Sequence, residues 1–384
     1  MSPLFSKTYG SRPYIIMCAF FFVVFTFSYL FCYQDNLLAM MQHILSNGQT
    51  HYNRLIGAII ITLLLMLLQL VLYVVTHLNG RLHILTYVPS IVLLTTLTAV
   101  DGNYTSGITI GPWWWIAPLI IILDAVALFY ARQLQDYDSS EGEFGFFSRT
   151  SWINYCGLTA LFMLVMFGAN HQRVLHMRLD VEQCIASQNY KKATATYARA
   201  LQTDSSLTNL RVYALSLSGQ LPERLFEYAL VGGSAVMLPS NPNVHYLLCG
   251  QAPLYQHLGG MFRQKMSTMH YLRFIHQHHL ATKAAHDYLL CAYLMDGNLD
   301  SFVHAIGKYY NLKKPLPKHY CEALVLYNHL RSNPYVVYHN SVMEADFTDF
   351  QTLIKQYNDA RQRIAAIRDT YGNTYWAYYY QLKH

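Results

Sequence analysis

Charged residues are scarce in this chain. They make up 12% of its 384 residues, against roughly 25% in an average globular protein, while hydrophobic residues reach 53%. The shortage lies in residues 1–169, which hold six of the 27 Lys and Arg and seven of the 21 Asp and Glu, a net charge of −1. The other 215 residues carry +7. This division excludes a wholly soluble protein and predicts one half in lipid and one in water.

Metal and phosphate motifs are also missing. The seven cysteines include no C-x-x-C pair and no Cys/His ligand spacing, which predicts buried free thiols, or a disulfide if the domain faces an oxidising compartment. His276 and His279 share a helical face, but no nearby acid or cysteine completes a metal site. No G-x-S-x-G or phosphate-loop spacing occurs. We therefore expect no metal, no cofactor and no nucleic-acid partner; the basic excess indicates ordinary solubility, or attraction to anionic lipid or an acidic protein.

Long apolar runs fill residues 1–170. A membrane span needs about 20 apolar residues, and the first two runs contain no charged residue. Aromatic residues such as Trp113 and Trp152 stand at the ends of runs, as in an interfacial belt. The first run is longer than a signal-peptide core and has no small-x-small site after it, so we expect an uncleaved anchor. The predicted spans are residues 14–33, 55–76, 83–100, 113–130 and 152–169.

The basic residues of the short loops predict the orientation. With the N-terminus inside, one cation (Arg54) lies outside and five lie inside. An odd number of spans then places residues 171–384 outside, which is the periplasm if the membrane is a bacterial inner membrane. The third span, with Pro89, is the weakest, and its loss would move the tail to the cytoplasm. The five inner cations are Lys7, Arg12, Arg81, Arg132 and Arg149.

Three acids of this half are candidate catalytic residues if the chain is an enzyme. Asp124 lies inside the fourth span, where a carboxylate is costly and so must face the bundle interior, as a functional group or as a hydrogen-bonded tie between helices. Asp35 and Asp101 follow the first and third spans. The layout is similar to that of membrane glycosyltransferases that use polyprenyl-linked sugars, which place a catalytic acid in the first outer loop; the resemblance implies a carboxylate that acts as a base. A solvated position at a helix end is the simpler interpretation of each loop acid.

Helices dominate the prediction for residues 171–384, so the fold class is all-α. The spacing of Cys184, Tyr190, Ala193, Tyr197 and Ala200 resembles a tetratricopeptide repeat. We predict helices over 181–187, 191–201 and 207–218, with a cap at residues 204–206. A second unit is predicted at 284–295 and 299–309, and a third pair at 318–330 and 347–370. Stacked pairs would form a solenoid that binds protein partners.

Aromatic residues crowd the C-terminus, from Tyr371 to Tyr380. This segment is expected to cap the last helix pair, to anchor at the membrane interface or to form a platform for sugars. Together with the repeat aromatics, it supplies the candidate partner-binding residues Tyr190, Tyr197, Tyr375 and Trp376.

Three segments of the tail, 209–233, 316–324 and 371–376, resemble an uncharacterised family of inner-membrane proteins from Bacteroidota. The resemblance implies a location and an architecture, and no activity. Our leading hypothesis is a membrane-anchored, non-enzymatic scaffold whose repeat domain binds a protein or envelope partner. The alternative is a transferase of envelope glycan or lipid. Transport through so few spans is the weakest hypothesis.

Overall fold

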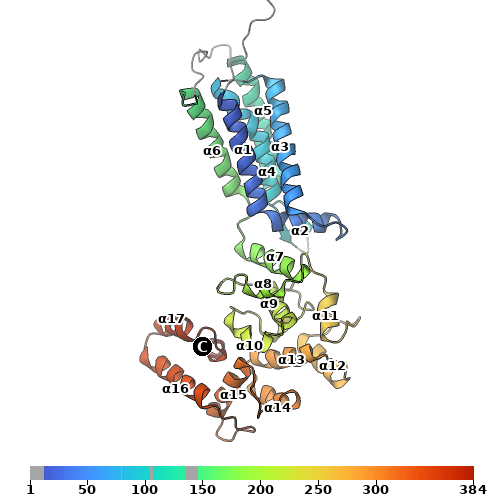
Figure 1. The fold of residues 1–384 in the computed structure, drawn as a ribbon, viewed down its shortest axis with the longest axis vertical. Coiled ribbons are helices and arrows are strands. Elements are labelled where there is room, and N and C mark those ends of the chain that lie inside the picture. Colours follow the sequence, from blue (N-terminus) through green and yellow to red (C-terminus); the bar gives the residue numbers. More distant parts are fainter. Residues whose placement is uncertain (1–12, 79, 104–106, 135–145) are drawn as a thin grey trace, which may run out of the picture. The chain divides into compact units, whose positions relative to one another are not determined.

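The protein forms helices in two separate units. A computed structural model describes residues 13–78, 80–103, 107–134 and 146–384. The two compact units are residues 1–172 and 173–384. Within the described residues, the remaining regular structure is one hairpin of two three-residue strands (Figure 1). The predicted all-α class is therefore confirmed.

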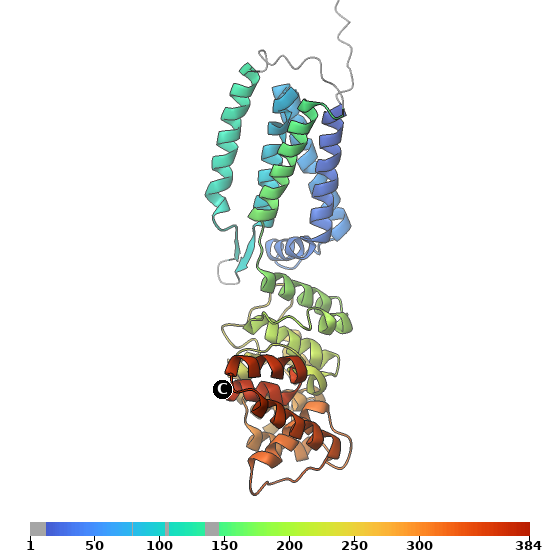
Figure 2. The same ribbon diagram turned by 90° about the vertical axis from the view of Figure 1, so that its left-hand side faces the viewer.

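The first unit contains five helices that are long and apolar enough to cross a membrane (Figure 2). The largest difference from the prediction is in the fourth, which was expected to end at Tyr130 and ends at Leu134. Figure 2 shows the long helices side by side. The unit consists of α1 (Pro13–Cys32), α2 (Asp35–Leu45), α3 (Arg54–Thr76), η1 (Gly80–Tyr87), α4 (Val88–Thr98), the antiparallel strands β1 (Asp101–Asn103) and β2 (Gly107–Thr109), α5 (Trp113–Leu134) and α6 (Arg149–Gly168).

The third span runs from one end of this bundle to the other. At its start, Gly80 donates its N–H to the Tyr14 hydroxyl (2.8 Å) and accepts a hydrogen bond from the Asn154 amide (2.9 Å). At its end, the Thr98 carbonyl accepts the N–H of Asn170 (2.9 Å). It begins as a 3₁₀ helix and continues as α4, in which Pro89 occupies the first turn, where its missing N–H has no intrahelical role. The span predicted to be the weakest, because of Pro89, is thus bonded to its neighbours at both of its ends.

Polar side chains also tie the spans together. Gln69 of α3 donates to the Thr86 hydroxyl (3.1 Å), and Ser90 of α4 donates to the Leu65 carbonyl (2.8 Å). All four residues are buried. In hydrocarbon no water competes for these groups, so such bonds fix which helix faces meet.

The second unit is built around one buried helix, α13. Every α13 residue from Tyr288 to Met295 is at most 9% exposed, and α13 packs against α9, α10, α11, α12, α14 and η4. The surrounding elements are α7 (Arg173–Ala186), α8 (Tyr190–Ala195), α9 (Ser205–Leu217), α10 (Leu221–Arg224), η3 (Leu225–Glu227), η4 (Gly233–Met237), α11 (Ala252–Leu258), α12 (Thr268–Gln277), α13 (Lys283–Met295), α14 (Leu299–Tyr309), α15 (Lys318–Leu330), α16 (Ser341–Gln356), α17 (Ala360–Tyr371) and α18 (Tyr375–Lys383).

A buried carboxylate holds the long loop that precedes α11. One oxygen of Glu182, on α7, accepts the backbone N–H groups of Leu247 (2.9 Å), Leu248 (2.6 Å) and Cys249 (3.1 Å). Glu182 is fully buried, and this burial raises its pKa. Because an unpaired buried N–H is costly, these bonds replace the secondary structure that the loop lacks.

Two of the predicted helices differ from the structure. The helix expected over 191–201 ends at Ala195, and Tyr197 has a positive φ of 52° that no continuing α-helix allows. The single helix expected over 347–370 is two helices, α16 and α17. The cap predicted before residue 207 is correct, because Asp204 accepts the Leu207 N–H at 2.7 Å. Helix pairs such as α13 with α14 and α16 with α17 do pack together, whereas a regular repeat stays a prediction.

Candidate functional site

Two of the three candidate catalytic acids lie at the same end of the membrane bundle. Asp35 begins α2, and Asp101 begins β1, whose partner strand β2 packs against α2. The Asp35 carboxylate is 3.4 Å from the Arg54 guanidinium, which also lies 4.1 Å from the centre of the Phe31 ring. The side chain of Asp101 lies outside the described residues. Asp35 therefore has a structural partner, a salt bridge to the start of α3.

Asp124 lies far from that end of the bundle. It is 5% exposed, and neither carboxylate oxygen has a hydrogen-bond partner among the described residues. Helix α5 begins at Trp113, shortly after β2, and Asp124 lies about 16 Å further along the helix axis at 1.5 Å per residue. Acid–base chemistry at one reacting atom requires groups within about 3 Å of it. Asp124 and the two acids at the α2 end thus do not serve one reacting atom.

The four candidate partner-binding residues fall into two classes. Tyr197 is 40% exposed and donates its hydroxyl hydrogen to Asp180 (2.7 Å), and Tyr190 is half-buried. Tyr375 and Trp376 are 0% and 2% exposed. Their side chains belong to the core and offer no surface to a partner. Of the three roles considered for the aromatic C-terminus, the structure supports the cap, because α18 packs on α15 and α17.

A buried pair on α15 fixes α18 in place. One oxygen of Glu322 accepts the backbone N–H of Tyr375 (2.7 Å) and lies 2.8 Å from His319 Nδ1. The backbone N–H of Phe226 donates to His319 Nε2 (3.3 Å), so Nδ1 carries the hydrogen and donates it to Glu322. The Trp376 indole N–H donates to the Glu322 carbonyl at 2.8 Å. Three N–H groups from two distant segments thus converge on a pair that is at most 1% exposed.

The position of α18 creates a pocket, which we name the α18 pocket. Its volume is about 400 Å³, within the usual range of roughly 300–1,000 Å³ for binding sites. Three apolar side chains at its rim face water: Leu201 (66% exposed), Val231 (40%) and Leu382 (45%). The remaining lining residues are Thr203, Phe226, Tyr228, Ala229, Leu230, Gly232, Gly233, Gly372, Ala377, Tyr378 and Gln381.

One wall of the α18 pocket is a fixed glycine turn. Gly232 and Gly233 have φ values of +83° and +58°, which side chains rarely adopt. Asp296, at the end of α13, accepts the backbone N–H of Ser234 (2.8 Å) and its hydroxyl hydrogen (2.7 Å). A Cβ on Gly233 would lie 2.9 Å from Asp296 Oδ1. Glycine is therefore required for the close approach of this wall to α13.

A buried arginine on α9 also holds this wall of the pocket in place. Arg211 of α9 is 2% exposed and donates to the carbonyls of Ala229 (3.2 Å) and Tyr197 (3.1 Å). Its guanidinium lies 5.3 Å from the centre of the Tyr228 ring. Burial lowers the pKa of Arg211, although an arginine with these bonds keeps its charge. The exposed Tyr197 segment and the pocket wall are thereby held by one side chain.

Part of this unit is found in other proteins. Residues 251–383 match the family of unknown function DUF6057. The matched region contains α13, the His319–Glu322 pair and α18, but not the glycine wall of the α18 pocket. The expected resemblance to an uncharacterised family is thus supported for these residues, while segment 209–233 lies outside the match. No curated protein and no solved structure is significantly similar to the chain.

The described lining of the α18 pocket is apolar, aromatic and neutral. Its lining residues in the described chain include no Asp, Glu, His, Cys or Lys. The Tyr378 hydroxyl donates to the Met295 carbonyl (2.8 Å), so it is already used in the fold. The glycine turn of one wall and the aromatic content of α18 are visible in the sequence. No local pattern indicates that Leu201 and Leu382, about 180 residues apart, meet at one rim.

Proposed function

We propose that the chain is a membrane-anchored helical scaffold that binds a protein partner through the α18 pocket. The observation that carries this proposal is the exposed apolar rim of Leu201, Val231 and Leu382 around a cavity of about 400 Å³. Exposed apolar groups clustered on one site mark interaction surfaces in soluble domains. An inserted apolar side chain would remove them from water, at about 25 cal/mol per Å² buried.

A rigid pocket suits this role better than a mobile one. The Asp296–Ser234 bonds and the Arg211–Ala229 bond fix one wall, and Glu322 fixes the other through Tyr375. A preformed site avoids the entropy loss of ordering a loop when the partner binds. The proposed occupant is a short segment of a partner protein with a large apolar residue at its centre. We further propose that the helix pairs of this unit belong to a tetratricopeptide-like solenoid.

The proposed compartment follows from the loop charges. With the N-terminus in the cytoplasm of a bacterial cell and five spans, the helical unit lies in the periplasm. A phosphatase that is active only outside the cytoplasm, fused after His384, tests this. Activity of the fusion supports the orientation, and an inactive but folded fusion contradicts it.

Site-specific crosslinking in native membranes tests the partner. A photoreactive residue is placed at Val231, in the pocket rim, and in a second protein at Val342, which is 67% exposed and outside the pocket. We expect one discrete protein product from Val231, lost when Leu382→Asp is added, and no such product from Val342. Equal products from both positions, or a Val231 product that survives Leu382→Asp, would contradict the proposal.

A further inference from the structure

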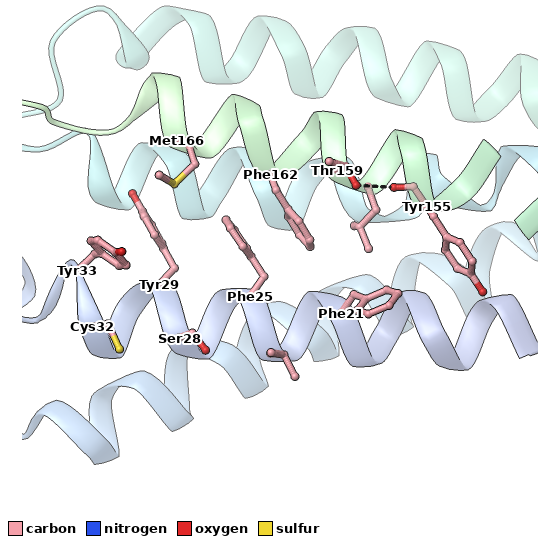
Figure 3. Close-up of a pocket in the computed structure, with 12 residues that line it drawn as sticks. Phe21, Phe25, Ser28, Tyr29, Cys32, Tyr33, Tyr155, Thr159, Phe162 and Met166 are labelled. Carbon is pink, nitrogen blue, oxygen red and sulfur yellow. Dashed lines mark hydrogen bonds between the residues drawn. The ribbon is translucent and has the colours of Figure 1, made fainter. Parts of the chain in front are cut away.

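A second pocket lies inside the membrane unit, between α1 and α6; we name it the α1–α6 pocket. Figure 3 shows its side chains projecting from both helices into one space. Its volume is about 540 Å³. It shares no residue with the α18 pocket, and all its residues but Tyr33 lie on two candidate membrane spans. It is lined by Phe21, Val24, Phe25, Ser28, Tyr29, Cys32, Tyr33, Tyr155, Leu158, Thr159, Phe162 and Met166.

We infer that the α1–α6 pocket binds an acyl chain of a membrane phospholipid. The pocket has the length of such a chain. From Phe21 to Cys32 the pocket follows α1 for about 16 Å at 1.5 Å per residue. One leaflet of a bilayer has about 15 Å of hydrocarbon, half of the roughly 30 Å core. The pocket is therefore as long as the acyl chains of one leaflet.

The volume of the pocket fits a lipid chain better than a helix. A helix about 10 Å across and 16 Å long occupies roughly 1,300 Å³, more than twice the pocket's volume. A chain of single carbon atoms, about 4 Å across, occupies roughly 200 Å³ over the same length. Phe25 and Phe162, one from each helix, stack with ring centroids 3.9 Å apart, so they leave no room for a larger element between them.

Exposure and charge along the pocket give the direction of the bound lipid. Hydroxyl groups line both ends: the Tyr155 ring lies 5.9 Å from that of Phe21, and Ser28 and Tyr33 line the other end (Figure 3). Tyr33 is 70% exposed, as suits the bilayer interface. That end adjoins α2 and the Asp35–Arg54 pair. The lipid headgroup is thus expected at the α2 end, with the acyl chain extending towards the middle of the bilayer.

Photocrosslinking with a labelled phospholipid tests this inference. The full-length protein is reconstituted into vesicles of phosphatidylethanolamine and phosphatidylglycerol containing a trace of phospholipid with a diazirine in one acyl chain. Labelled positions are located by mass spectrometry. We expect labels concentrated on the pocket residues of α1 and α6. Labels spread evenly over the exposed faces of α3, α5 and α6, or crosslinks between two protein chains, would overturn the proposal.

A matched pair of variants sharpens the test. Thr159→Phe fills the pocket, whereas Ala160→Phe introduces the same side chain one residue away, on an exposed position outside it. We expect Thr159→Phe to reduce pocket labelling about tenfold and Ala160→Phe to leave it unchanged. If Thr159→Phe does not fold, Ser28→Phe fills the pocket from α1. Equal labelling of the filled and control variants would show that no specific chain site exists.

Discussion

The Glu322 carboxylate offers the sharpest test of how the helical unit holds α18. In Glu322→Ala, the Tyr375 N–H and the His319 Nδ1–H lose the oxygen to which they donate at 2.7 and 2.8 Å. Both residues are fully buried, so water does not replace it. Each orphaned donor costs about 1–3 kcal/mol, which makes the expected loss about 4 kcal/mol.

The loss should appear as local opening of α18, because Tyr375 is its first residue. Amide hydrogen exchange of the full-length protein in detergent micelles measures it directly, through peptides that cover residues 372–384. A loss of about 4 kcal/mol accelerates exchange by roughly a thousandfold. Glu322→Gln keeps an acceptor oxygen and loses only its charge, so we expect a loss of about 1 kcal/mol and roughly fivefold faster exchange.

The control for this prediction is Glu344→Ala. Glu344 pairs with His339 at 3.1 Å on the surface, where both side chains are exposed. Such a pair contributes at most about 1 kcal/mol. If α18 exchanges no faster in Glu322→Ala than in Glu344→Ala, the buried pair does not hold the helix and does not shape the α18 pocket.

Three further predictions concern single residues elsewhere in the chain. Gly233→Ala should lower the free energy of unfolding by about 1–2 kcal/mol, because φ is +58° and the new Cβ meets Asp296. Gly307→Ala, at an open helical position, should raise the free energy of unfolding by about 0.5 kcal/mol. Thermal unfolding in detergent measures both changes. Burial lowers the pKa of His257 from 6.5, so the unfolded chain binds its proton more tightly and stability falls as the pH drops below 6.5. The melting temperature should therefore fall more between pH 7.5 and 5.5 in the wild type than in His257→Gln, and equal falls would contradict this. Asp124→Asn should raise the melting temperature in detergent, because it removes a buried carboxylate without a hydrogen-bond partner; a fall would show an undetected stabilising role.

The five spans and most helix starts could be predicted because their causes are local. A run of about 20 apolar residues must form a helix in hydrocarbon, where each backbone group needs a partner within its own segment. The caps follow the same logic, since Asp204 bonds an N–H only three residues away. Even the third span, with its proline, was visible as an apolar run, although only its end contacts with Tyr14 and Asn170 show that it traverses the bundle.

The direction in which the aromatic C-terminus packs was decided by the tertiary structure. Tyr and Trp suit a membrane interface, a ligand platform and a core equally well. This segment packs into the core because it bonds to the pair of Glu322 and His319, which lies 53 residues or more away in sequence. Both pockets have the same origin, because each forms between segments that the chain separates widely. A periodic pattern reports which face of a helix is apolar, but the neighbour that covers that face, and the space left beside it, depend on packing across the whole unit.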